Sequence, residues 1–174
     1  MINIIITSYK EPKATVRAVE AFLKQNISQD FRITIVDPFP EVESYLNENI
    51  KDKRVNFFLD PGEGKSYALN ILLNEMHSKN TNDIFILTDG DVYVSDNAVY
   101  EIMKRFQDRN IGCVTGKPVS IDTRQKKYGF WSHVVFAGID KTRNRFSNEN
   151  RFFECSGYLF AIRNGVITYF TLET

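Results

Sequence analysis

The chain has 174 residues and carries 22 basic and 22 acidic side chains, so its formal net charge is zero. This balance disfavours a general nucleic-acid binder, which needs a basic surface to neutralise phosphates. The apolar share of 43% is ordinary for a globular domain with a real core, and the length suits one domain.

The two cysteines, Cys113 and Cys155, are too few for a disulfide framework, and with only His77 and His133 beside them they do not make a zinc cluster. We therefore expect two buried free thiols in a reducing compartment. The N-terminus does not resemble a signal peptide, and no apolar run approaches the roughly 20 residues that span a bilayer. The sequence predicts a cytoplasmic protein, peripheral at a membrane only through a partner or a further segment.

Short apolar runs alternate with amphipathic stretches up to residue 116. The runs predict strands at residues 2–7, 33–36, 55–59, 84–87 and 111–115. The stretches predict helices opened by Pro12, following Pro40, and at residues 66–77 and 96–108. This rhythm indicates an α/β fold, a Rossmann-like and mostly parallel sheet with helices on both faces. Ligands of such sheets bind at the carboxyl ends of the strands.

The rhythm breaks after Gly116. Residues 117–150 are polar and basic around an aromatic stretch, Tyr128–Phe136, and an apolar segment follows. We expect a single domain, residues 1–174, in which residues 1–116 bind the ligand and residues 117–174 build a substrate surface on them.

Asp89, Gly90 and Asp91 follow the apolar run at residues 84–87 and are the strongest chemical signal. Residues two apart in an extended segment project to the same side, so the two carboxylates converge on one point. Converging carboxylates repel each other unless a cation lies between them, and Mg²⁺ or Mn²⁺ meets that need while binding phosphate oxygens. Gly90 leaves the approach unobstructed. The alternative is an Asp-Gly turn without a ligand.

Residues 60–66, Asp-Pro-Gly-Glu-Gly-Lys-Ser, look like a phosphate-binding loop ahead of a helix. A P-loop needs a glycine five positions before its last one, where this chain has Leu59. A P-loop NTPase with Asp89 as its acidic metal ligand is one alternative, and a glycine loop with Ser66 near a helix N-terminus is another. We favour a third interpretation, with Lys65 as a contact in the ligand site.

The first two predicted strands also end in residues suited to a ligand. Asp37 is placed to hydrogen-bond a base or ribose edge, or else it precedes Pro38 in a turn. Tyr9 is placed to stack on a base or to cover the end of the sheet, and Glu11 follows it.

Together these motifs resemble glycosyltransferase family 2, with its type A nucleotide-sugar-binding fold, over nearly the whole chain. The matching segments, in order, are Ile4–Glu11, Ile35–Asp37, Gly64–Asn70, Asp89–Asp91, Val114–Gly116, and Ser156-Gly157 with Arg163. Thr7, Lys10 and Pro38–Pro40 depart from the family's usual residues, and the Gln-x-x-Arg-Trp motif of processive members is absent.

The resemblance implies transfer of a sugar from a UDP- or GDP-sugar to an acceptor hydroxyl, with inversion. Mn²⁺ or Mg²⁺ would lie on Asp91 against the donor's diphosphate, and Asp89 would either help to hold the metal or contact the ribose instead. The donor site would comprise Ser8, Tyr9, Glu11, Asp37, Lys65, Asp89 and Gly90. The later region, with Trp131 and His133, would face the acceptor, a glycan or a lipid-linked sugar. Its alternative is an aromatic helix face packed on the sheet.

The family's catalytic base lies in a Glu-Asp pair after the acceptor segment, so we expect it shortly after residue 174, with Glu173 the carboxylate closest to that place. The chain by itself is then expected to bind donor and metal but to transfer sugar slowly or not at all. A nucleotidyltransferase and a catalytically inactive nucleotide-sugar-binding module are further alternatives.

Overall fold

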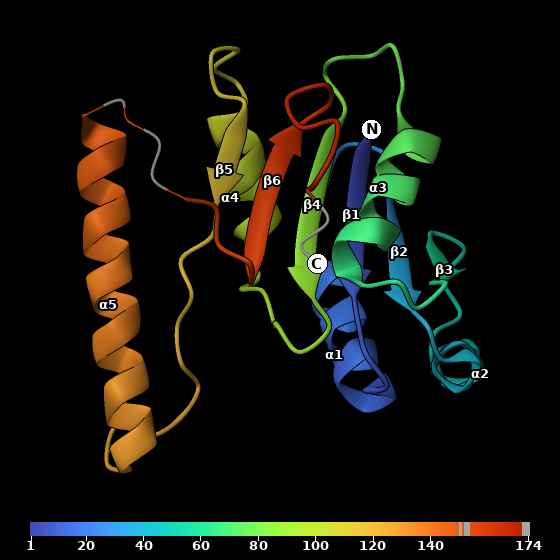
Figure 1. Ribbon diagram of the computed structural model, residues 1–174, viewed down its shortest axis with the longest axis horizontal. Helices are drawn as coiled ribbons and strands as arrows, with labels where there is room; N and C mark the ends of the chain where they lie inside the picture. The colour runs from blue at the N-terminus through green and yellow to red at the C-terminus, as the bar shows by residue number, and fades with distance from the viewer. Residues whose placement is uncertain (150, 152–153, 172–174) are drawn as a thin grey trace.

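The computed structural model describes residues 1–149, 151 and 154–171 (Figure 1). Its strands are β1 Ile2–Thr7, β2 Phe31–Asp37, β3 Val55–Leu59, β4 Ile84–Asp89, β5 Cys113–Thr115 and β6 Leu159–Arg163. Its helices are α1 Pro12–Leu23, α2 Pro40–Asn49, α3 Lys65–Met76, α4 Ala98–Arg105 and α5 Lys127–Asn148. The strands form one sheet in the order β3-β2-β1-β4-β6-β5.

The centre of the sheet is parallel and buried on both faces. β1 pairs in parallel with β2 and β4, and β2 pairs in parallel with β3. Ile4 and Ile6 of β1 join the cluster on one face, whereas Ile5 joins the cluster on the other. A strand covered on both sides needs apolar residues at successive positions, which explains its almost wholly apolar sequence.

Helices cover the two faces from opposite sides (Figure 1). α1, α2 and α4 bury Phe22, Leu46 and Ile102 against one face. α3 buries Leu69 and Leu72 against the other. α1 and α2 each begin with a proline, which suits the first helical turn because its N–H groups have no partner within the helix. The prediction of a mostly parallel sheet with helices on both faces is confirmed.

β6 runs antiparallel to both of its neighbours and lies between β4 and β5. The chain leaves the sheet after β5 and returns at Leu159, where the Gly116 N–H donates to the Leu159 carbonyl oxygen at 2.8 Å. Residues 117–158 are thus an excursion between two adjacent antiparallel strands. Residues 117–174 were predicted to build a surface on the sheet. Within them, residues 159–163 form β6, which is an inner strand of the sheet itself.

α5 lies within this excursion, beside the β5 edge rather than over a face of the sheet (Figure 1). Its inner side meets the body through Phe136, whose ring centroid lies 5.7 Å from that of Tyr158, and through an ion pair between Lys117 and Asp140 at 2.7 Å. The rings of Tyr128 and Trp131 are 82% and 56% exposed. The alternative of an aromatic helix face packed on the sheet is therefore wrong.

None of the described helices is both long and apolar enough to cross a membrane.

Candidate functional site

A hollow of about 410 Å³ lies at the carboxyl ends of β1, β2 and β4, beside the loop that precedes α3. It is lined by Thr7, Ser8, Tyr9, Glu11, Val36, Pro38, Asp60, Gly62, Gly64, Lys65, Asp89, Gly90 and Asp91. Every predicted donor or metal residue except Asp37 is in this set. The candidate base Glu173 lies outside the described residues.

The carboxylate of Asp89 is held from two sides. Thr7 and Asp89 are register partners on β1 and β4, and the Thr7 hydroxyl lies 3.0 Å from Asp89 Oδ1. The Lys65 ammonium forms an ion pair with the same oxygen. Sequence reasoning found Lys65 and Asp89 but missed the role of Thr7, because that role depends on the register of two strands far apart in the chain.

Asp91 lies two residues further on, with an exposed side chain. Within the described part of the chain it has neither a hydrogen bond nor an ion pair to its carboxylate. Its oxygens are therefore available to a ligand.

The hollow carries an excess of negative charge. Glu11, Asp60, Asp89 and Asp91 line it, against the single ammonium group of Lys65. An anionic phosphate ligand would be repelled by these carboxylates unless a cation came with it. The described residues contain no group of three or more protein side chains suited to a metal ion. Asp89 and Asp91 nevertheless fit a Mg²⁺ or Mn²⁺ whose other ligands are phosphate oxygens and water, since such ions are commonly held by one or two carboxylates.

Asp37 is wholly buried beneath one wall of the hollow. Its Oδ2 accepts the N–H of Lys10 at 2.9 Å, and its Oδ1 accepts the N–H of Phe39 at 2.8 Å. Lys10 has a left-handed φ of 58°, an unfavourable conformation for a residue with a side chain, and the hydrogen bond to Asp37 stabilises it. Asp37 thereby fixes the two segments that carry the aromatic wall.

That wall is Tyr9, which lines the hollow and packs on Phe39, a partly buried ring behind it. Their ring centroids lie 5.1 Å apart in an edge-to-face arrangement, and Tyr9 is 72% exposed. Sequence reasoning missed Phe39, although an aromatic residue between two prolines at the end of a strand was a usable signal.

Gly90 and Ser8 bring the end of β4 close to the start of α1. A Cβ on Gly90 would lie 3.1 Å from both Ser8 Cβ and Thr15 Oγ1. The Thr15 hydroxyl donates to the Glu11 carbonyl oxygen at 2.8 Å, so at the 2.6 Å contact between the two hydroxyls Ser8 is the donor. The hydroxyl of Ser8 is thus used to hold β1 to α1.

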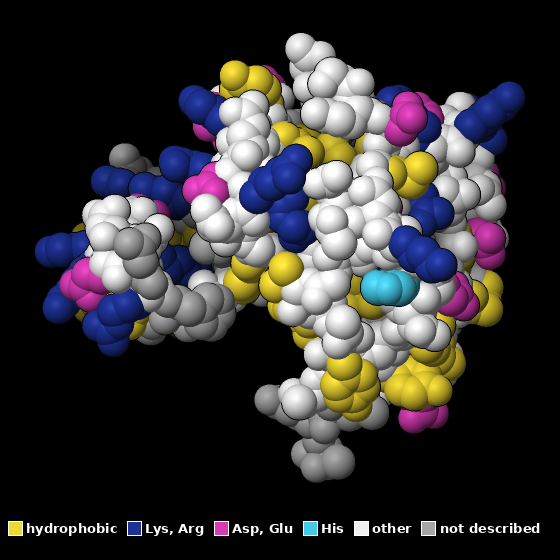
Figure 2. Space-filling model, turned by 90° about the horizontal axis from the view of Figure 1, so that it is seen from above, with side chains coloured by type: hydrophobic (Ala, Val, Ile, Leu, Met, Phe, Trp, Pro, Cys, Tyr) yellow, Lys and Arg dark blue, Asp and Glu magenta, His cyan; other side chains and the backbone are white. Residues whose placement is uncertain are grey.

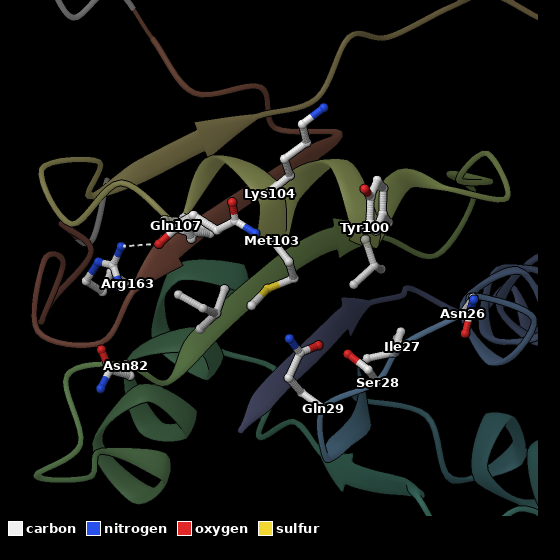
Figure 3. A pocket seen from close by; sticks show the side chains of 13 residues that line it. Asn26, Ile27, Ser28, Gln29, Asn82, Tyr100, Met103, Lys104, Gln107 and Arg163 are labelled. Carbon is white, nitrogen blue, oxygen red and sulfur yellow. Dashed lines mark hydrogen bonds between the residues drawn. The ribbon is translucent and has the colours of Figure 1, made fainter.

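A second hollow, of about 380 Å³, lies at the opposite ends of the strands, between α4 and residues 26–29 (Figure 3). It contains no carboxylate. Its Arg163 donates to the carbonyl oxygens of Phe106 at 3.0 Å and Asp108 at 3.2 Å. Arg163 also pairs in register with Ile84, the first residue of β4, so it lies far from the carboxyl-end site. The resemblance matched Arg163 together with Ser156-Gly157, and in the structure Arg163 anchors the end of α4.

A mostly parallel sheet with two carboxylates at the end of a central strand, and a glycine loop ahead of a helix, is an α/β arrangement whose candidate site lies at the carboxyl ends of the strands. The family model of glycosyl transferase family 2 matches residues 3–170. The chain therefore belongs to glycosyl transferase family 2. No curated protein matches it.

Solved structures show the same fold. The mannosyltransferase PcManGT from Pyrobaculum calidifontis, in complex with GDP-Man and Mn²⁺, is 17% identical with a TM-score of 0.65, over 93% of this chain and 44% of that one. TarS 1–349 from S. aureus is 18% identical with a TM-score of 0.52, over 71% of this chain and 37% of that one. The chain thus spans less than half the length of either protein.

Proposed function

We propose that the carboxyl-end hollow binds a nucleotide-diphosphate sugar together with Mn²⁺ or Mg²⁺, and that the sugar is transferred to an acceptor hydroxyl with inversion. The observation that carries the proposal is the charge of the hollow, four carboxylates against one ammonium group. A diphosphate needs a cation there, and Asp91 has its carboxylate free within the described residues. The complex of PcManGT with GDP-Man and Mn²⁺ supports this choice of ligands.

The nucleoside would lie against Tyr9, which Phe39 supports from behind, with the exposed face of Tyr9 available for stacking on the base. Asp37 acts in this proposal by holding that wall, because both of its oxygens already accept backbone N–H groups. Ser8 and Gly90 likewise shape the hollow through their close approach to Thr15.

The diphosphate would lie between Asp91 and Lys65, with Glu11 at the border of the same hollow. A bound divalent ion, held by Asp91 and Asp89, supplies the positive charge that stabilises the leaving diphosphate. Lys65 neutralises Asp89 in the free protein and lies where it can also contact a phosphate. The hydroxyl of Thr7 keeps Asp89 in place.

The acceptor would approach from the side of the basic arm, by which we mean residues 117–149. This arm holds seven Lys and Arg against three Asp and Glu, although the whole chain is balanced. Figure 2, which looks down on one end of α5, shows basic side chains together with some acidic ones on the lobe at the left of the molecule. Exposed Tyr128, Phe130 and Trp131 lie on the same arm. We propose that it faces an anionic membrane surface carrying a lipid-linked acceptor, since basic and aromatic side chains favour such interfaces. Cytoplasmic location stays a prediction.

Calorimetric titration with GDP-mannose and UDP-sugars, with and without Mn²⁺, tests donor binding. We expect binding that requires the metal and is lost in Asp91→Asn. Asp96→Asn is the matched control, because Asp96 is exposed on the same loop between β4 and α4 and does not line the hollow. Metal-dependent binding that survives in Asp91→Asn would refute the metal assignment, and the anomeric configuration of the product by NMR tests inversion.

The same preparations decide between this proposal and its alternatives. Steady ATP or GTP turnover that disappears in Lys65→Ala would favour a P-loop NTPase. Transfer of a nucleotidyl group from a nucleoside triphosphate would favour a nucleotidyltransferase. Donor binding with neither transfer nor slow hydrolysis of the donor would favour an inactive binding module. Co-sedimentation with phosphatidylglycerol vesicles but not with phosphatidylcholine vesicles tests the membrane-facing arm.

A further inference from the structure

Cys113 and Cys155, far apart in the sequence, meet at the base of the excursion that carries the basic arm. Their sulfur atoms lie 2.9 Å apart, with Cys113 on β5 and Cys155 on the segment that returns to β6. The Ser156 N–H donates to the Thr115 hydroxyl at 2.8 Å and holds this segment against β5. Both thiols are free and only partly buried. The sequence predicted that both thiols would be buried, and this prediction is wrong.

A cation lies near Cys155, because Arg143 forms an ion pair with Glu154, the residue that precedes this cysteine. The Arg143 side chain, from α5, is 13% exposed, and its Nη2 lies 2.9 Å from Glu154 Oε1. Its Nε and Nη1 are buried and have no hydrogen-bond partner within the described part of the chain. A buried guanidinium with two unused donors favours a neighbouring group that can become an anion.

The two thiols differ in acidity. The hydrogen bond with Cys113 lowers the pKa of Cys155, and the positive charge of Arg143 lowers it further, against the opposing effects of burial and Glu154. The same hydrogen bond raises the pKa of Cys113, and burial adds to the effect. Cys155 is thus the thiol that ionises first, and the thiolate is the reactive form.

We propose that Cys113 and Cys155 are a redox-active pair that forms a reversible disulfide, with Cys155 as the attacking thiolate, Arg143 as the cation that stabilises it, and Cys113 as the resolving thiol. The oxidant is a low-molecular-weight disulfide such as oxidised glutathione. Cys155 attacks one of its sulfurs, whose S–S bond breaks, and one thiol leaves. Cys113 then attacks Cys155 Sγ in the mixed disulfide and displaces the second thiol. Two protein S–H bonds are replaced by one S–S bond, and the two electrons and two protons end on the two released thiols.

The disulfide would fasten the excursion to the sheet at its base. It would close a loop from residue 113 to residue 155, and such a cross-link stabilises a protein mainly by restricting its unfolded chain. We expect the melting temperature to rise by about 5 °C or more on oxidation and to return on reduction. The pair lies outside the donor hollow, so nucleotide-sugar binding is a separate property.

Mass spectrometry after equilibration in glutathione buffers tests the pair. In oxidised buffer we expect the monomeric chain to lose about two mass units and to resist alkylation after denaturation. Since the chain has two cysteines, a disulfide within it can only be this one. Cys113→Ser is expected to retain one glutathione on Cys155, whereas Cys155→Ser is expected to stay largely unmodified. Two thiols that remain equally open to alkylation, or disulfides formed only between chains, would overturn the proposal.

The alkylation rate of Cys155 tests the role of Arg143 separately. In the Cys113→Ser background, Arg143→Gln is expected to slow alkylation of Cys155 at pH 7 about threefold or more, while Arg143→Lys keeps the charge and most of the rate. Arg145→Gln is the matched control, because Arg145 is exposed and paired with Glu149. Circular dichroism verifies that each variant is folded. Equal rates in the Gln and Lys variants would remove Arg143 from the proposal.

Discussion

A Cβ on Gly90 would fit tightly, because it would lie 3.1 Å from Ser8 Cβ and from Thr15 Oγ1, where the end of β4 approaches the start of α1. Gly90→Ala is therefore expected to lower the free energy of unfolding by about 1–3 kcal/mol, as for other substitutions that overpack a site. Urea denaturation measures the change. Gly138→Ala is the control, since no atom lies within 4 Å of its Cβ position and alanine favours a helix. Equal stability of the two variants would contradict the tight approach.

A substitution of Lys65 can test the proposed phosphate binding with little effect on the stability of the fold. Its ammonium and the Asp89 carboxylate are both partly exposed, and exposed ion pairs contribute only about 0–1 kcal/mol. Lys65→Met is thus expected to leave the melting temperature nearly unchanged and to weaken nucleotide-diphosphate binding about tenfold or more. Lys104→Met, in the second hollow, is the control and should change neither quantity. A large loss of stability without a loss of affinity would make Lys65 a structural residue.

The residues found from the sequence are those whose chemistry is local. Asp89 and Asp91 are two positions apart, and Lys65 closes a glycine loop, so their roles are visible in short motifs. The role of Thr7 depends on the register of two strands, and the position of Phe39 depends on the buried carboxylate of Asp37. No short sequence motif records either of these. Cys113 and Cys155 come together only because β6 enters beside β5.

At the scale of the elements, Asp83 ties together three strand ends, the amino ends of β1 and β4 and the carboxyl end of the antiparallel β6. Its carboxylate accepts from the Met1 ammonium at 2.7 Å, the Ser78 hydroxyl at 2.7 Å and the Asn80 amide at 2.9 Å. Its carbonyl oxygen accepts the N–H of Asn164, directly after β6, at 2.9 Å. Burial opposes ionisation, but hydrogen bonds from the Met1 ammonium and Ser78 outweigh it and hold the pKa of Asp83 below its usual value.

The sign of the pH dependence follows from that lowered pKa. Asp83 contributes its full stabilisation above an unfolded-state pKa of about 4, and the contribution is lost as pH falls through the lower folded-state pKa. Asp83→Asn is expected to cost about 1–3 kcal/mol at pH 7 and clearly less at pH 3, measured by urea denaturation. A cost that does not shrink in acid would show that charge is not the cause.

Asp52→Asn is the control for Asp83→Asn. A side-chain hydrogen bond from Arg54 lowers the pKa of Asp52 to about 2, yet this pair is solvent-exposed. Loss of the ion pair between Arg54 and Asp52 is expected to change the free energy of unfolding by only about 0.5 kcal/mol or less.

The elements up to residue 116 were predictable, because each buries an apolar stripe or run whose period is visible in the sequence. Their ends differ by a few residues, as with the strand predicted at 111–115 and found at Cys113–Thr115. A helix in the place of α5 was predicted only as an alternative, without bounds, as an aromatic helix face packed on the sheet. Most of its apolar side chains face outward among Lys and Arg, so it lacks one continuous apolar stripe.

At the scale of the whole molecule, the sheet depends on a strand that comes late in the chain. A chain of residues 1–116 would lack β6, leaving β4 unpaired on one side and β5 without its neighbour. We expect this shortened chain to lack a cooperative unfolding transition by circular dichroism. A sharp transition from it would show that residues 1–116 fold alone.

A second variant separates β6 from the arm. Because β5 and β6 are antiparallel neighbours, a short flexible loop can join residue 117 to residue 158 in place of the excursion. We expect this variant to unfold cooperatively and to keep metal-dependent nucleotide binding, while losing its attraction to anionic vesicles. Loss of the cooperative transition in both variants would assign the arm a structural role.

The insertion of β6 between β4 and β5 also sets an order of events while the chain is being made on the ribosome. β5 emerges early, but its neighbour β6 is synthesised only after the whole excursion. Until then one edge of β4 is open to pairing with other chains, and exposed strand edges are where nascent proteins aggregate. Slow passage of the excursion through the ribosome would lengthen that exposure, so the yield of folded protein should depend on translation speed across residues 117–158.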